Sequence, residues 1–213
     1  MRIVGLAVAC CLGVAGCGGG SGPQANPRST PQTARLQALL GRVPDMPDGF
    51  SDRARDQWRP PFTPVNGSCQ TLFALIGGRP PKEDLTAATA VTYQGVGVGS
   101  MAAVSLAVYQ GDSSQRQLDA MREAMAGCAT ADDTTPGASN RLTASALSMN
   151  EDGWVTGRLK GRVGGYPYEM HLVIARQGRT LVGLLNAGVR DPDVKRTEEL
   201  GRLLMAKVGT LDL

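Results

Sequence analysis

The chain has 213 residues and a formal net charge of +3 at pH 7, and only 4% of its residues are aromatic. So small a charge argues against a nucleic-acid partner and against strong electrostatic attachment to anionic lipid. The scarcity of aromatic side chains argues against the stacking platforms that many sugar-binding proteins use.

The N-terminus has the layout of a secretory signal peptide: Arg2 precedes an apolar run that extends to about Ala15. The run is shorter than the roughly 20 residues that span a bilayer. The stretch from Val14 to Cys17 resembles the lipobox of bacterial lipoproteins, in which the cysteine becomes the acylated first residue. We therefore predict a signal peptide over residues 1–16 and a lipid on Cys17. The alternative is an ordinary signal peptide cleaved nearby, with Cys17 unmodified.

The next residues are rich in Gly, Pro, Ser and Thr, which predicts that residues 17–33 hold the lipidated cysteine and a flexible tether. Residues 34–213, roughly 180 residues, suffice for one domain with a real core. Of the five cysteines, two lie in the predicted signal peptide and one is Cys17. An exported domain folds in an oxidising compartment, so we expect Cys69 and Cys128 to form a disulfide.

Helical spacing opens the folded part. Within residues 31–43 the apolar positions recur at i, i+3, i+4 and i+7. A charged, proline-bearing loop follows, in which we expect Trp58 and Phe62 to cover an edge of the core. A second helix is predicted over residues 68–77, with Ser68 as its cap.

Two alternating segments, residues 87–94 and 101–110, predict strands. The sequence GVGVGS at residues 95–100 joins them. A phosphate-binding loop would need a helix on its far side, and here strand-like sequence continues. We therefore favour a hairpin connection, whose glycines also suit a lip beside a cleft.

The clearest helix covers residues 114–128, with Ser114 and Gln117 fitting a capping box. Cys128 lies on its apolar face, as Cys69 does on its own helix, so a disulfide between the two closes easily. A polar surface loop is expected over residues 129–140.

Four more strands and a helix complete the chain. The strands are predicted over residues 142–149, 154–163, 166–176 and 179–186. The helix is expected to begin at Asp191–Pro192. These elements predict an α+β fold with one disulfide, in which helices pack on one face of a curved, mainly antiparallel sheet of about six strands.

A two-residue turn at Gly164–Gly165 predicts the register of one hairpin, with Lys160 opposite Glu169 and Arg158 opposite His171. One face of this hairpin then carries five polar residues, Arg158, Lys160, Arg162, Glu169 and His171. This face is either a strip that binds an anionic headgroup or a partner, or an ordinary solvated surface. We favour the solvated surface, because Glu169 offsets part of the charge.

Catalysis has little support in the sequence. His171 is the one histidine, and no G-x-S-x-G motif accompanies it. One histidine, two paired cysteines and no spaced carboxylate cluster also argue against a metal site. We expect no enzymatic activity, no cofactor and no metal.

A wider pattern carries a resemblance: the lipobox, the polar tether, PDGF at residues 47–50, Cys69 opening a helix, and VSLAVYQGDSSQRQLDAMREAMAGC at residues 104–128. Together these resemble actinobacterial lipoproteins with a PknH-like extracellular sensor domain; lipoproteins of the Mog1/PsbP-like fold are a neighbouring possibility. The PknH-like resemblance implies helices against an antiparallel sheet and a cleft for an unknown ligand, and transfers no site residue. Members often have a second disulfide, which this chain lacks.

From these signals we expect a lipoprotein anchored on the extracytoplasmic face of the cell membrane, acting as a non-enzymatic ligand-binding or sensor domain. The alternative is an interaction module that docks onto another envelope protein through the sheet or through the loop that carries Trp58 and Phe62.

Overall fold

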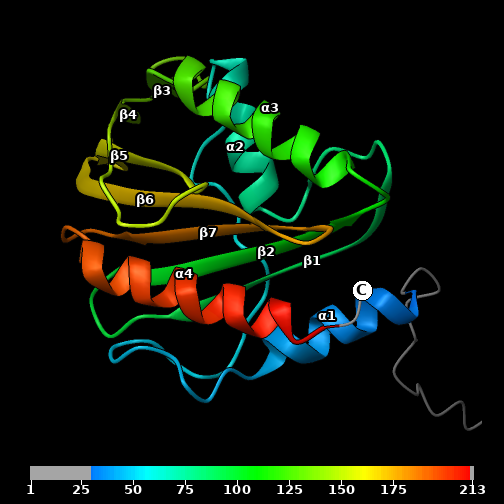
Figure 1. The fold of residues 1–213 in the computed structure, drawn as a ribbon. Coiled ribbons are helices and arrows are strands. Elements are labelled where there is room, and N and C mark those ends of the chain that lie inside the picture. Colours follow the sequence, from blue (N-terminus) through cyan, green and yellow to red (C-terminus); the bar gives the residue numbers. More distant parts are fainter. Residues whose placement is uncertain (1–29, 212–213) are drawn as a thin grey trace, which may run out of the picture.

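A computed structural model describes residues 30–211 of the chain. These residues form an antiparallel sheet of seven strands with helices on both of its faces (Figure 1). The helices are α1 (Pro31–Gly41), α2 (Gly67–Ile76), α3 (Ser113–Gly127) and α4 (Val194–Gly209). The strands are β1 (Leu85–Gln94), β2 (Met101–Tyr109), β3 (Thr130–Asp132), β4 (Arg141–Ser145), β5 (Val155–Val163), β6 (Tyr166–Gln177) and β7 (Thr180–Gly188). The predicted signal peptide, Cys17 and most of the tether lie outside the described residues.

The predicted α+β class and antiparallel sheet are confirmed, with strand order β1-β2-β7-β6-β5-β4-β3. Two details of the structure differ from the prediction. The sheet has seven strands in the described residues, because three residues of the expected polar loop pair with β4 as strand β3, too short to show an alternating pattern. Helices also cover both faces, because the inner strand β7 is buried along its whole length and an apolar strand needs cover on both sides.

On one face, α2 and α3 pack against the sheet (Figure 1). Trp58 and Phe62 are buried there and contact the ring of Phe73 edge-on, with ring centroids 5.5 and 6.0 Å apart. The expectation that they cover the core is confirmed. The predicted disulfide between Cys69 and Cys128 is also present, with a Cα–Cα distance of 4.9 Å, and it ties α2 to the end of α3.

On the opposite face, α1 and α4 enclose a second apolar core. The hydroxyl of Tyr93 on β1 donates to the carbonyl of Leu40 at 2.6 Å, which fixes α1 against the sheet. Trp154 packs against α4 at Gly201, where a Cβ would lie 2.5 Å from the indole ring. Gly201 therefore lets α4 lie close to the start of β5.

Three helix starts differ from the predictions. The side chain of Asn66, not Ser68, caps α2, and Asp112 precedes α3 without a side-chain cap bond. Ser114 lies inside α3, where its buried hydroxyl donates to the carbonyl of Gly178. The cap of α4 is Asp193, two residues after the predicted Asp191, because its carboxylate accepts from the backbone N–H of Arg196.

In residues 30–211, the helices are all too short or too polar to cross a membrane.

Candidate functional site

The predicted register of the β5–β6 hairpin is confirmed, with Lys160 opposite Glu169 and Arg158 opposite His171. The predicted polar side chains therefore share the face of the sheet that α4 covers. Arg162 lies apart from the others and donates to the carbonyl of Gly165 in the turn. The remaining four form one cluster.

The expectation of a solvated face is wrong for the two β6 residues of this cluster. Glu169 is 2% exposed and His171 is fully buried. The reason is that the first turn of α4 crosses this part of the sheet, and its Thr197 contacts His171. Sequence alternation indicated which side these residues face, and it did not indicate that a helix would lie there.

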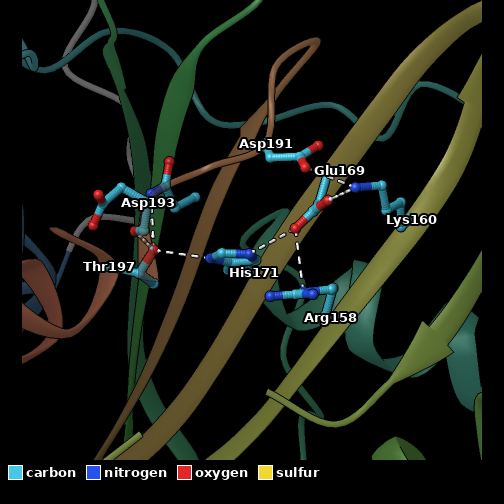
Figure 2. Close-up of polar contacts among 8 residues, drawn as sticks. Arg158, Lys160, Glu169, His171, Asp191, Asp193 and Thr197 are labelled. Atoms are coloured by element: carbon cyan, nitrogen blue, oxygen red, sulfur yellow. Dashed lines mark hydrogen bonds and ion pairs between the residues drawn. The ribbon is translucent and has the colours of Figure 1, made fainter. Parts of the chain in front are cut away.

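Glu169 is a buried carboxylate surrounded by three cationic or hydrogen-bonding groups (Figure 2). Its Oε1 lies 3.2 Å from Arg158 Nε and 2.9 Å from His171 Nε2, and its Oε2 lies 2.8 Å from Lys160 Nζ. A buried charge is tolerated when it is paired in this way. The pairing holds β5, β6 and the turn before α4 in one arrangement.

Lys160 bridges the buried carboxylate to the surface, since its Nζ also lies 2.8 Å from Asp191 Oδ2 in the loop before α4. These hydrogen bonds, with Asp191 the larger cause and Glu169 the next, raise the pKa of Lys160. The hydrogen bond to Lys160 in turn lowers the pKa of Asp191. Both groups stay charged at neutral pH and tie the loop down over the cluster.

His171 continues the chain of contacts towards α4. Its Nδ1 lies 3.2 Å from Thr197 Oγ1, and Asn186 Nδ2 donates to the same hydroxyl at 2.8 Å. Burial lowers the pKa of His171, and the hydrogen bond from its ring to Glu169 only partly opposes this. A pKa below the ordinary value of 6.5 leaves the imidazole neutral at pH 7.

A pocket of about 190 Å³ opens beside this chain of contacts. The end of β7 forms its floor at Asn186 and Gly188, and Ser100 and Val98 of the β1–β2 connection form one rim. The segment 190–196, which leads into α4, forms the other. The glycine-rich connection is a hairpin, as predicted, and it borders a pocket.

A larger groove of about 530 Å³ lies on the opposite face, between the end of α3 and β5. In its wall the side chain of Met125 lies against the backbone of Gly157, where a Cβ would lie 2.4 Å from Met125 Sδ. No buried polar side chain lines this groove among the described residues. It is a larger hollow with fewer groups to orient a ligand, so the smaller pocket is the better candidate.

The prediction missed three residues of this site: Asn186, Thr197 and Asp193. Asn186 is the polar residue in the apolar strand sequence LVGLLNAG, and Thr197 stands on the same side of its helix as Leu200, Leu204 and Val208. A buried polar side chain on an otherwise apolar face needs a partner. A polar residue on an apolar face was therefore the sequence signal that could have identified Asn186 and Thr197.

The chemistry of the cluster is binding and positioning. Both ring nitrogens of His171 contact protein groups, and the ring is closed to solvent. Nothing in residues 30–211 brings three or more His, Cys, Asp or Glu side chains together as a metal site. The arrangement presents hydrogen-bonding groups at the pocket.

The fold is similar to a solved structure, the extracellular domain of PknH from Mycobacterium tuberculosis. The two share 12% sequence identity with a TM-score of 0.53, over 83% of this chain and 89% of that one. At this identity the likeness concerns the fold. No protein-family model and no curated protein sequence matches the chain.

Proposed function

We propose that this chain is a lipoprotein anchored by Cys17 to the extracytoplasmic face of the cell membrane, and that its folded domain binds a ligand without transforming it. The observation that carries the proposal is the pocket beside α4, where the nearly buried Asn186 is held by Thr197 and, through it, by His171. A rigid polar group at the floor of a pocket is typical of a binding site.

Two further observations support this proposal. The fold resembles the extracellular domain of PknH, which is compatible with a domain that works outside the cytoplasm. The disulfide between Cys69 and Cys128 is of the kind that persists in an oxidising compartment. An extracytoplasmic sensor domain is consistent with both the fold likeness and the disulfide.

Thermal unfolding in the presence of a small-molecule extract of the cell envelope tests the proposal. A bound ligand raises the melting temperature of the folded protein, because it binds the native state alone. We expect the rise to disappear in Asn186→Leu and to persist in Asn150→Leu, whose side chain is exposed and away from the pocket. An equal rise in both variants, or none in the native protein, contradicts the proposal.

A second function, docking onto an envelope protein, is favoured by a different observation. Val96 and Val98, at the tip of the β1–β2 hairpin, are 89% and 86% exposed. In the loop first considered for docking, the side chains of Trp58 and Phe62 are buried in the core. Crosslinking in native membranes should capture a partner that the double variant Val96→Ser, Val98→Ser fails to capture.

A further inference from the structure

The pocket beside α4 contains an unused hydrogen-bond acceptor. Asn186 is 3% exposed and donates its Nδ2 to Thr197, while its Oδ1 accepts no hydrogen bond from any residue in 30–211. This oxygen is not sealed inside the protein, and Asn186 lines the pocket. A fixed amide oxygen in such a position requires a donor from whatever enters.

At the pocket, the carboxylates have partners within the protein and the arginines form no ion pair in the described part of the chain. The two carboxylates are already engaged, Asp191 with Lys160 and Asp193 with the backbone N–H of Arg196 at the cap of α4. The exposed residues Arg190 and Arg196 also line the pocket, and neither forms an ion pair within residues 30–211. Two arginines thus stand at the pocket without a carboxylate partner from these residues, and each guanidinium can donate charge-assisted hydrogen bonds to an entering anion.

The position of one of these cations is restricted by its neighbour. Nη1 of Arg196 lies close to Gly49, where a Cβ would come within 3.0 Å of it. The guanidinium of Arg196 therefore lies beside the backbone of Gly49, next to Phe50, which also lines the pocket. A planar guanidinium donates in a fork that matches a carboxylate or a phosphate.

The size of the pocket limits the ligand. The pocket has a volume of about 190 Å³, below the roughly 300–1,000 Å³ of pockets that take drug-sized ligands. An acyl chain or a long glycan does not fit, whereas a small molecule or a single headgroup does. The ligand must also meet both an acceptor and two cations.

We infer that this pocket binds a small oxyanion, a carboxylate or a phosphate, that also carries a hydroxyl or amino donor. The oxyanion lies against Arg190 and Arg196, and the donor group bonds to Asn186 Oδ1. The inference rests on the proposed function and names the ligand class for the same site. Free metabolites and glycerophosphate headgroups of lipids share this chemistry.

Calorimetric titration of the folded protein with matched probes tests both halves of the inference. Lactate carries a carboxylate and a hydroxyl, propionate lacks the hydroxyl, and glycerol lacks the anion. We expect lactate to bind at least about fivefold more tightly than propionate, since an unmet buried acceptor is costly. Glycerol should not bind measurably. Equal affinity for lactate and propionate, or binding of glycerol alone, overturns the inference.

Substitutions of the two arginines test whether they bind the anion. Arg190→Gln with Arg196→Gln should weaken lactate binding at least about tenfold, because charge-assisted hydrogen bonds to both guanidinium groups are lost. Arg35→Gln is the matched control, an exposed arginine on α1 away from the pocket. Equal weakening in the control, or none in the double variant, contradicts the assignment. Circular dichroism of each variant confirms that it is folded.

Two further titrations distinguish a free ligand from a lipid headgroup, and their negative results show which of the two proposals fails. Titration with glycerol 3-phosphate and with phosphatidylglycerol vesicles shows whether the anion is taken free or from a lipid surface. If none of these probes binds while the envelope extract still stabilises the protein through Asn186, the ligand class is wrong and the proposed function stands. If neither the probes nor the extract has an effect, both fail.

Discussion

His171 is closed to solvent and contacts Glu169 through one nitrogen and Thr197 through the other. The positive charge of Arg158, which also pairs with Glu169, adds to the burial that lowers the pKa of His171. A histidine that is buried in its neutral form is protonated more readily in the unfolded chain than in the folded protein. This difference gives the cluster a measurable dependence on pH.

Between pH 7.5 and 5.5 we expect the free energy of unfolding to fall as the pH falls. The pKa of His171 is below its ordinary value of 6.5 in the folded protein, so the unfolded chain binds more protons in this window. The stability that neutral His171 contributes is fully present above pH 6.5, and it is lost as the pH falls towards the lower pKa of His171 in the folded protein. Urea unfolding at several pH values measures the slope.

The matched variant for this measurement is His171→Gln, which keeps a donor towards Glu169 and removes the titration. Because His171 is the one histidine of the chain, the variant should show a flatter dependence in this pH window. An unchanged slope, or a native protein that gains stability at pH 5.5, would show that His171 is not buried in its neutral form.

At the scale of elements, the end of the sheet depends on one close backbone approach. Gly161 on β5 pairs with Leu142 on β4, and a Cβ at Gly161 would lie 2.0 Å from the carbonyl oxygen of Arg141. A side chain here cannot be accommodated by rotating a neighbour, because the obstacle is backbone.

Gly161→Ala should therefore lower the free energy of unfolding by about 1–3 kcal/mol, the usual range for overpacking. Hydrogen exchange should increase in β4, whose pairing with β5 is disturbed. Gly41→Ala is the control, since no atom lies within 4 Å of a Cβ at the exposed end of α1. Loss of stability in the control and none in Gly161→Ala would contradict this register.

The disulfide between α2 and α3 closes a loop with a sequence separation of 59 residues. A cross-link over such a loop restricts the unfolded chain and contributes about 4 kcal/mol in the chain-entropy model. Chemical unfolding of the oxidised and the reduced protein should differ by an amount of this order. Equal midpoints would mean that packing of α2 against α3 alone holds this face.

Across the whole molecule, local patterns predicted the elements well because their causes are local. The two-residue turn at Gly164–Gly165 fixed which residues of β5 and β6 face each other, and the structure confirms that register. The contact of Thr197 with His171 spans 26 residues. It depends on how α4 crosses the sheet, and spacing along a helix reveals only which side is apolar.

Local patterns also failed to predict that helices cover the second face of the sheet. Alternation in a strand identifies its two sides, yet β7 is apolar on both, so a helix on each side was required. The polar cluster was placed correctly on one face, whereas its two β6 residues, Glu169 and His171, are buried and not solvated as expected. Burial of a charge depends on partners from several elements, which one strand pattern cannot report.

Membrane attachment is the prediction that concerns the whole protein. Cys17 lies outside the described residues, and we expect the mature chain to begin there with a lipid. Intact mass measurement of the native protein should give an N-terminal residue with acyl chains, and detergent-phase partition should be lost in Cys17→Ser. An unmodified N-terminus at another residue would remove the anchor and leave the folded domain unchanged.

The most direct test of the binding account is a nuclear magnetic resonance titration of the isotopically labelled protein with the small-molecule envelope extract. The account predicts shifts of the Asn186 side-chain amide, of the backbone amides of Ser100 and Gly188, and of the first turn of α4. Shifts confined to the groove between α3 and β5, or no shifts at all, would contradict it.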